Sequence, residues 1–195
     1  MAAADAVAQA MRDVDRRGFL PRPLRSHAGE DRPLPIGRGQ TNSQPRTVAA
    51  MLRLLELAAG QRVLDVGAGS GWTTALIAHL VGSTGSVIGV ELEPDLAAWG
   101  AANLDAAVAA RAGESASARI EVARKGVLGW PWEAPYDRVL VSAAARELPG
   151  ALVDQLAADG SMVCVVGSRM LRVRHGVEGK PAITEHGYYS FVPLR

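Results

Sequence analysis

The sequence predicts an α/β fold: a Rossmann-like, doubly wound, mostly parallel sheet with helices on both faces and an antiparallel C-terminal strand pair. From residue 62 onward, short apolar runs alternate with helix-like segments, which is typical of a parallel sheet covered on both sides. One of these runs, Arg62–Val66, opens into a turn with a glycine at every second position, Gly67–Gly71. The chain of 195 residues suits one complete core rather than two large domains.

Residues 1–60 are expected to form N-terminal helices and a loop that covers the rest of the domain. Apolar residues at helical spacing predict an amphipathic helix over 2–17. Prolines and glycines are too dense between 18 and 44 for a regular helix, so we expect a long binding loop or lid there. A second helix is predicted over 45–57, with Ser43 close to its capping position.

Residues 61–195 are expected to form the α/β core of this single domain, which spans 1–195. Ligands of such sheets bind at the carboxyl ends of the strands. The predicted strands are 62–66, 87–91, 120–122, 137–141 and 162–166, the predicted helices are 73–81, 95–111 and 148–157, and the final antiparallel pair is 171–174 with 188–192.

The glycine turn and the acid at the end of the next strand together predict a nucleoside-binding corner. Glycine lacks a Cβ, so a ligand can lie directly against the main chain. The helix that follows begins with unpaired N–H donors. Glu91 ends the second strand, where a carboxylate can accept both hydroxyls of a ribose. The simpler alternative is a glycine turn that only connects a strand to a helix.

The spacing of the glycines favours S-adenosylmethionine over a dinucleotide. The dinucleotide fingerprint is G-x-G-x-x-G, whereas this chain has Gly67-x-Gly69-x-Gly71 with Asp65 two residues before the first glycine. The form D-x-G-x-G-x-G is the pattern of S-adenosylmethionine-dependent methyltransferases. Asp65 could help to hold the cationic end of the cofactor's amino-acid tail, directly or through water.

A second unusual segment spans Pro33–Pro45. Two prolines stiffen it and two glycines let it turn, after which Thr41, Asn42 and Ser43 offer three hydrogen-bonding side chains in a row. Taken alone, the segment fits an elaborate helix cap by Ser43 or Thr41 as well as it fits a binding loop.

Taken together, these motifs resemble the protein-L-isoaspartate O-methyltransferase family. The resemblance covers nearly the whole chain, and the pattern Pro-Leu-Pro-Ile-Gly…Gln-Thr-x-Ser-Gln-Pro is specific to that family. The matching segments are Asp15-Arg16 with Phe19 and Pro21, Pro33–Pro45, Val63–Ala75, Gly89–Glu91, Gly129–Pro131, Ala134–Asp137 and Phe191–Leu194.

The resemblance implies an activity. Such enzymes transfer a methyl group from S-adenosylmethionine to the free α-carboxylate of an L-isoaspartyl residue in a damaged protein, and the ester then collapses to a succinimide. The family's active-site serine falls on Ser43. The implied substrate-binding residues are Thr41, Asn42 and Ser43, no metal ligand is expected, and the implied cofactor-binding residues are Gln40, Thr41, Ser43, Asp65, Gly67, Ala68, Gly69, Ser70, Gly71, Glu91, Leu92, Lys125 and Gly126.

The chemistry needs little from acid–base groups. Methyl transfer is an in-line displacement, so its main requirement is alignment of the reacting groups. A carboxylate with a pKa near ~4 is already ionised at neutral pH and requires no general base. Ser43 would orient the acceptor carboxylate, and the four histidines are interpreted as structural or solvated.

Two of the departures from the family pattern concern the implied site residues. Asn42 stands where the family usually has an apolar residue. Arg124-Lys125-Gly126 replaces a Gly-Asp-Gly run whose acid recognises the adenine amino group. Lysine has no acceptor lone pair, so adenine contacts are expected from the backbone there. Two alternatives stay open: methylation of another carboxylate acceptor, such as a modified peptide or small molecule, and a non-catalytic relative with an altered cofactor site. An oxidoreductase is least favoured.

Composition argues against several other classes. The net charge is +1, without a basic stripe, so no nucleic acid partner is expected. No apolar run reaches ~18 residues, so we expect no membrane span. A cytoplasmic location and a monomer are separate expectations. The lone cysteine, Cys164, sits in an apolar run and is interpreted as a small hydrophobe. Five N-terminal arginines alternate with acids and are interpreted as a solvated helix face: Arg12, Arg16, Arg17, Arg22 and Arg25.

Overall fold

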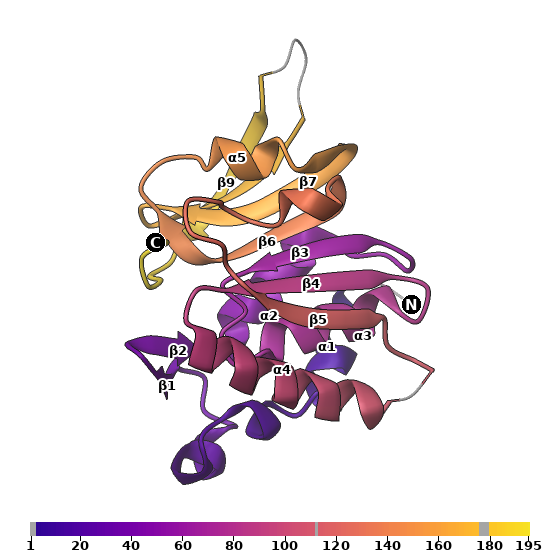
Figure 1. Ribbon diagram of the computed structural model, residues 1–195, viewed down its shortest axis with the longest axis vertical. Helices are drawn as coiled ribbons and strands as arrows, with labels where there is room; N and C mark the ends of the chain where they lie inside the picture. Colours follow the sequence, from indigo (N-terminus) through magenta and orange to yellow (C-terminus); the bar gives the residue numbers. More distant parts are fainter. Residues whose placement is uncertain (1–2, 112, 176–179) are drawn as a thin grey trace.

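A seven-stranded sheet in the order β5-β4-β3-β6-β7-β8-β9 forms the centre of the protein (Figure 1). The computed structural model describes residues 3–111, 113–175 and 180–195. Strands β3 to β7 pair in parallel, whereas β7–β8 and β8–β9 pair antiparallel, which confirms the predicted sheet. The strands are β3 (Arg62–Val66), β4 (Ser86–Glu91), β5 (Ser117–Val122), β6 (Tyr136–Ala145), β7 (Leu156–Val166), β8 (Arg169–Arg174) and β9 (Ala182–Tyr188).

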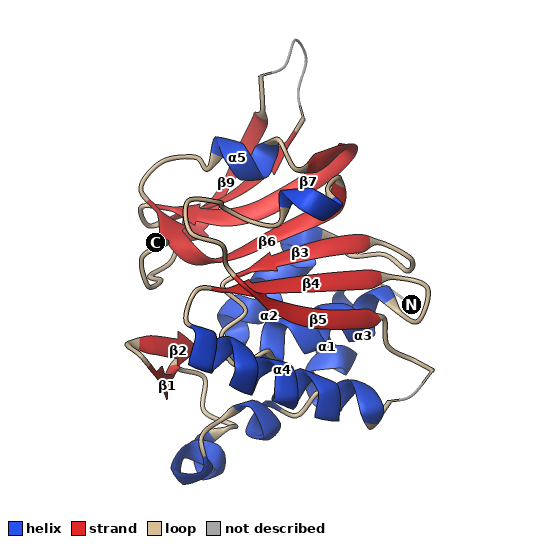
Figure 2. Ribbon diagram, viewed as in Figure 1, coloured by secondary structure: helices blue, strands red, loops and turns tan. Residues whose placement is uncertain are grey.

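Helices cover both faces of the sheet, but unequally (Figure 2). The four longer helices pack on one face, and the other is covered by α5, the 3-10 turn η3 and the segment between β5 and β6. None of the helices in the described residues is long and apolar enough to cross a membrane. The helices are α1 (Ala3–Asp13), α2 (Pro45–Leu55), α3 (Trp72–Val81), α4 (Pro94–Ala109) and α5 (Gly150–Val153), with 3-10 helices η1 (Arg16–Phe19), η2 (Arg22–His27) and η3 (Pro131–Glu133).

The central strands are buried on both faces, as the continuous apolar runs predicted. On β7, Val163 faces the side of the longer helices and Cys164 faces the opposite side, and both side chains are fully buried. Burial raises the pKa of the Cys164 thiol to about 12, so the thiol stays protonated and packs as a small apolar group.

Several predicted boundaries at the C-terminal end of the chain are wrong. The helix expected over 148–157 exists only as α5, and β7 already begins at Leu156, which pairs with Tyr136 on β6. The backbone N–H of Tyr136 donates to the carbonyl of Gln155, so a contact from a distant strand ends the helix. The last strand is β9, at Ala182–Tyr188, rather than 188–192. Strand β5 also begins three residues before the predicted start at 120.

The N-terminal region is more ordered than the loop predicted for 18–44. The α-helix ends at Asp13 instead of residue 17, and the expected first residue, Ala2, lies outside the described residues. No α-helix forms over the described residues 18–44, yet they contain the 3-10 helix η2 and a hairpin of β1 (Leu34–Gly37) with β2 (Gln40–Asn42). Arg38 and Gly39 form its turn with φ of 54° and 72°, as a tight hairpin turn requires.

Candidate active site

A cavity of about 640 Å³ opens at the carboxyl ends of β3, β4, β5 and β6. It lies where the chain order reverses, since β4 follows β3 on one side and β6 lies on the other. This is the place where open α/β sheets bind ligands. Its walls include Gly67 and Gly69 after β3, Glu91 at the end of β4, the loop 123–129 after β5, and Ser142 on β6.

The glycine turn presents bare backbone to this cavity. Gly69 has φ of 54°, and an added Cβ would lie 3.2 Å from the Cδ1 of Ile36 on the hairpin. Gly71 has a different role, because it does not line this cavity and a Cβ on it would lie 2.6 Å from the carbonyl oxygen of Gly100. The glycine therefore lets the turn pack directly against α4, and this geometry gives no support to the cofactor contact expected of Gly71.

Glu91 lies where the sequence predicted a ribose-binding acid. Its side chain lines the cavity, and the residue is only 6% exposed. One carboxylate oxygen accepts a hydrogen bond from the N–H of Gly69 at 2.8 Å, and the other accepts one from the N–H of Glu93 at 3.0 Å. Each oxygen keeps a second acceptor site, so a pair of hydroxyl donors can still be bound.

Asp65, the other acid of the motif, lies inside the protein and does not line this cavity. Its Oδ2 accepts a hydrogen bond from the hydroxyl of Thr74 at 2.7 Å, and its Oδ1 is buried without a partner among the described residues. Burial, reinforced by the charge of Glu91, raises the pKa of Asp65 to about 7 despite the bond from Thr74. The expected direct contact of Asp65 with a cofactor is therefore not supported.

The raised pKa of Asp65 predicts a pH-dependent stability. Between about pH 4 and pH 7 the folded protein keeps the proton that the unfolded chain loses, so stability falls as the pH rises through this window. Asp65→Asn removes this loss. We measure urea unfolding of both proteins without cofactor. From about pH 5 to pH 8, the free energy of unfolding of the variant should rise by about 2–3 kcal/mol relative to that of the wild type. Parallel pH profiles of the two proteins would contradict the assignment.

The hairpin β1–β2 places residues 40–43 beside the glycine turn. The amide nitrogen of Asn42 donates to the hydroxyl of Ser70 at 3.0 Å, and its amide oxygen accepts from Nε of Arg16 at 2.7 Å. Asn42 is buried at 4% exposure, with both ends of its amide engaged inside the protein. The predicted contact of the Asn42 side chain with substrate is therefore not supported: the amide joins the hairpin to the turn.

Arg16 corrects the interpretation of the N-terminal arginines. The other four are exposed, as predicted, but Arg16 is 4% exposed, and its guanidinium lies 5.4 Å from the ring centre of Trp72. Burial lowers its pKa to about 10, which leaves it charged at neutral pH. Besides Asn42 Oδ1, its donors reach the carbonyls of Ala28, Glu30, Arg32, Asn42 and Ser43. The sign of this role available in the sequence was that Asp15-Arg16 is one of the segments that match the family.

Ser43 lies on a second cavity, of about 740 Å³, rather than on the first. Thr41 lines both cavities, and Gln40 lines only the first. A space of about 30 Å³, walled partly by Thr41, Ser43 and Gly67, lies between them. Ala68 and Ser70 also border this small space, but they line neither of the two large cavities. The arrangement can hold one molecule on the glycine side and a second on the Ser43 side.

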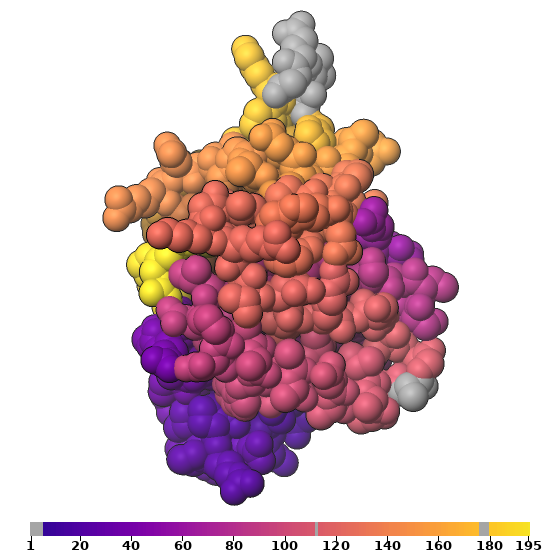
Figure 3. Space-filling view, viewed as in Figure 1, coloured from indigo at the N-terminus to yellow at the C-terminus, as the bar shows by residue number. Residues whose placement is uncertain are grey.

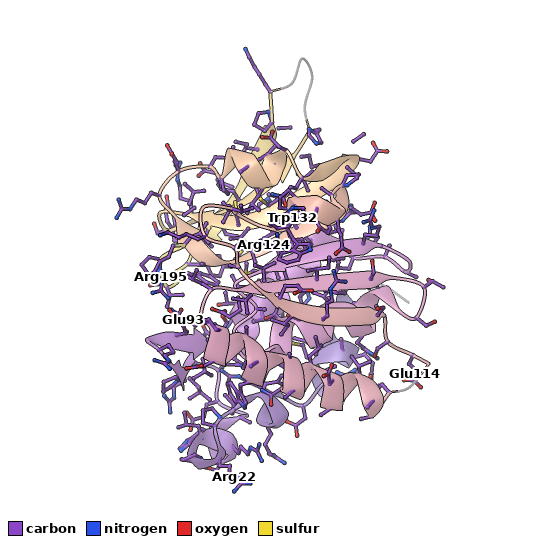
Figure 4. All side chains as sticks on the ribbon, viewed as in Figure 1. Arg22, Glu93, Glu114, Arg124, Trp132 and Arg195 are labelled. Atoms are coloured by element: carbon purple, nitrogen blue, oxygen red, sulfur yellow. The ribbon has the colours of Figure 1, made fainter. Side chains whose placement is uncertain are left out.

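Leu92, Lys125 and Gly126, for which the resemblance implied cofactor contacts, line the first cavity. Arg124 beside them stacks over Trp132, with the guanidinium carbon 4.2 Å from the ring centre (Figure 4). None of the side chains in the loop 123–129 carries an acceptor, so any acceptor that this loop offers to a ligand has to be a backbone carbonyl.

The C-terminal residues form a wall that sequence reasoning missed. The N–H of Leu194 donates to the carbonyl of Ala144 at 2.8 Å, which holds the segment beside β6. Arg195, which lines the cavity, pairs with Glu93 at 2.8 Å (Figure 4). In Figure 3 the C-terminal residues, coloured yellow, lie beside magenta and purple surfaces, which belong to residues earlier in the sequence. The match of Phe191–Leu194 to the family was the only sequence sign of this wall.

Neither histidines nor metal ligands contribute to these walls. The four histidines, at positions 27, 79, 175 and 186, line neither of the two large cavities nor the small space between them. Within residues 3–111, 113–175 and 180–195, no three His, Cys, Asp or Glu side chains are grouped so that they could hold a metal ion.

The model of the family described as Protein-L-isoaspartate(D-aspartate) O-methyltransferase (PCMT) matches residues 1–195. The chain belongs to this family. A protein-L-isoaspartate O-methyltransferase of Methanopyrus kandleri is 44% identical over 192 residues, which cover 96% of this chain and 82% of that one. The relative of the same name from Anaeromyxobacter dehalogenans is 44% identical over 194 residues, covering 96% and 88%.

Solved structures of the protein-L-isoaspartate O-methyltransferase family share the fold. A crystal structure from Plasmodium falciparum, described as a protein-L-isoaspartate O-methyltransferase in complex with S-adenosyl-L-homocysteine, superposes with a TM-score of 0.82 at 26% identity. The match covers 98% of this chain and 90% of that one.

Proposed function

We propose that this protein transfers a methyl group from S-adenosylmethionine to the free carboxylate of L-isoaspartyl residues in damaged proteins or peptides. The observation that carries the proposal is that two cavities, one lined by the glycine turn and one by Ser43, share the wall residue Thr41, in a chain whose residues 1–195 the family model matches. A repair enzyme of this kind needs a cofactor space and an acceptor space that open onto each other.

The residues of the first cavity fit S-adenosylmethionine. Its volume of about 640 Å³ lies in the range of small-molecule sites. Gly67 and Gly69 would hold the amino-acid end against bare backbone, Glu91 would accept the ribose hydroxyls, and carbonyls of the loop 123–129 would meet the adenine amino group in place of an acid. When bound, the cofactor supplies a methyl group activated by a sulfonium.

On the acceptor side, the protein has to provide orientation. The isoaspartyl carboxylate is ionised at neutral pH, so no residue has to remove a proton. The hydroxyl of Ser43 would donate a hydrogen bond to one carboxylate oxygen and align it with the opening between the cavities. Thr41 lines both cavities and would separate cofactor from acceptor. Gln40, Leu92, Lys125 and Gly126 would contact the cofactor, while Ala68, Ser70, Gly71 and Asp65 would support its cradle.

Transfer of labelled methyl groups tests the proposal. We expect the purified protein to label an isoaspartyl peptide and not the matching aspartyl peptide. Ser43→Ala should lower kcat/KM about 10–100-fold, because one hydrogen bond to a charged oxygen is lost, while the affinity for S-adenosyl-L-homocysteine changes little. Ser26→Ala, on an exposed residue of η2, is the control and should match the wild type.

Two negative results point to the alternatives. Binding of S-adenosyl-L-homocysteine without labelling of the isoaspartyl peptide would indicate a different carboxylate acceptor. Absence of binding heat would indicate a non-catalytic relative whose cofactor site Lys125 has altered.

We further propose that residues 1–60 and 61–195 work as one domain, the first covering the cofactor core of the second. Contacts of the hairpin with the glycine turn, such as Asn42 with Ser70, support this. A monomer in the cytoplasm, acting on proteins or peptides rather than nucleic acid, completes the proposal, consistent with the net charge of +1.

A further inference from the structure

Strand β6 carries a bulge at its carboxyl end. Leu140 pairs with Val163 of β7, and the next pair is Ala144 with Val165, so β6 uses more residues than its partner. Residues 141–143 of β6, with Ser142 in the middle, lie opposite the single residue Cys164 of β7, so β6 has two residues more than its partner there. Bulges are common beside active sites because they redirect a side chain. No sequence motif pointed to this segment.

The bulge places Ser142 at the boundary between the two large cavities. Thr41 and Ser142 are the two residues that line both large cavities and also the small space between them. Ser142 also packs against the glycine turn: a Cβ added to Gly67 would lie 3.7 Å from the Cβ of Ser142. Within the described part of the chain, the hydroxyl of Ser142 makes no side-chain hydrogen bond, so its donor is available.

The small space between the cavities offers neutral donors and no cation. Its walls contain no lysine, arginine or histidine among the described residues. Arg46 lines the Ser43 cavity, but its guanidinium pairs with Asp31 at 2.6 Å. A carboxylate that must act as a nucleophile is better held by hydroxyls, because a cation would stabilise its charge and weaken its attack. A donor on each of the two carboxylate oxygens would fix the direction in which the attacking oxygen points.

We propose that Ser142 is the second hydroxyl that binds the acceptor carboxylate, opposite Ser43, and that the pair makes the site specific for a carboxylate. This inference rests on the proposed function and extends it to a residue outside the Gln40–Ser43 segment. Ser43 comes from the hairpin side and Ser142 from the sheet, so the two donors would fix the carboxylate between separate elements of the fold.

The test compares Ser142→Ala and Ser142→Thr with the wild type. We measure methylation of an isoaspartyl peptide, the affinity of that peptide for the complex with S-adenosyl-L-homocysteine by calorimetry, and the affinity for S-adenosyl-L-homocysteine alone. Ser142→Ala should lower kcat/KM and peptide affinity at least tenfold with an unchanged affinity for S-adenosyl-L-homocysteine. Ser142→Thr, which keeps the hydroxyl, should restore most of both. Ser168→Ala, at an exposed turn outside the cavities, should match the wild type.

Each other outcome overturns the inference. An active wild type with an equally active Ser142→Ala overturns it and leaves the proposed function intact. A parallel loss of affinity for S-adenosyl-L-homocysteine assigns Ser142 to the support of the glycine turn instead. If the wild type binds the peptide but does not methylate it, the proposed function is wrong. If the peptide affinity of Ser142→Ala is then also unchanged, this inference is overturned as well. A wild type that neither methylates nor binds the isoaspartyl peptide overturns both.

Discussion

Arg16→Lys is expected to lower the free energy of unfolding by about 3–5 kcal/mol. The guanidinium fork of Arg16 donates to the Asn42 amide oxygen and to five backbone carbonyls, and it is almost fully buried. A lysine has three donors at a single point, so several of these acceptors would be left buried and unpaired. Because lysine keeps the positive charge, the expected loss of stability reports on the geometry of the guanidinium fork rather than on the charge.

The same change should reduce activity. Arg16 contacts Asn42 and the carbonyl of Ser43, which belong to the segment between the two cavities. Loss of these contacts should displace Ser43 by up to about 1 Å. Under conditions where the variant is folded, this displacement should lower kcat/KM about 10–100-fold. Urea unfolding and methylation assays measure the two effects. The control is Arg17→Lys, an exposed neighbour that should change stability by less than about 0.5 kcal/mol. Equal behaviour of the two variants would rule out the structural role of Arg16.

Gly71→Ala is expected to cost about 3–5 kcal/mol of stability and to weaken cofactor binding at least tenfold. Gly71 has φ of 87°, which is strained for alanine, and the new Cβ would lie 2.6 Å from the carbonyl oxygen of Gly100. Neither backbone can yield without moving the turn away from α4. Gly69, two residues earlier, would then leave its position at the cavity wall.

A matched control separates the contact from the backbone strain. Gly113 has nearly the same φ, 86°, but a Cβ there would meet nothing within 4 Å. Gly113→Ala should therefore cost only the strain of about 1–2 kcal/mol and leave binding of S-adenosyl-L-homocysteine unchanged. Denaturant unfolding and calorimetry give both quantities. If both variants lose the same stability, the close approach of Gly71 to Gly100 is not a strong constraint.

The elements predicted best are those whose signals are local. The predicted strand 62–66 coincides with β3, and the predicted helix 73–81 differs from α3 by one residue. An apolar run, a glycine turn and a helix follow one another within twenty residues, so each boundary is marked by its neighbours. The predicted helix 148–157 failed for the opposite reason. Its end is set by the pairing of β7 with β6, which brings Leu156 to Tyr136.

The candidate site divides in the same way. Glu91 was predicted on the cavity wall, because strand ends in a parallel sheet share one edge. Arg16 was misinterpreted, because its carbonyl partners lie 12 to 27 residues away in the chain. Ser142 gave no signal at all, since a strand bulge depends on how many residues the neighbouring strand uses.

By itself, the sequence determined the α/β class, the glycine corner and the family to which the chain is similar, because residue spacing and backbone preference act over short distances. Only the tertiary structure decided which polar groups reach the cavities. It buried Asn42, Asp65 and Arg16 and placed Ser142 on the walls of both large cavities. Whether a side chain contacts ligand or protein depends on elements that meet only when the chain folds.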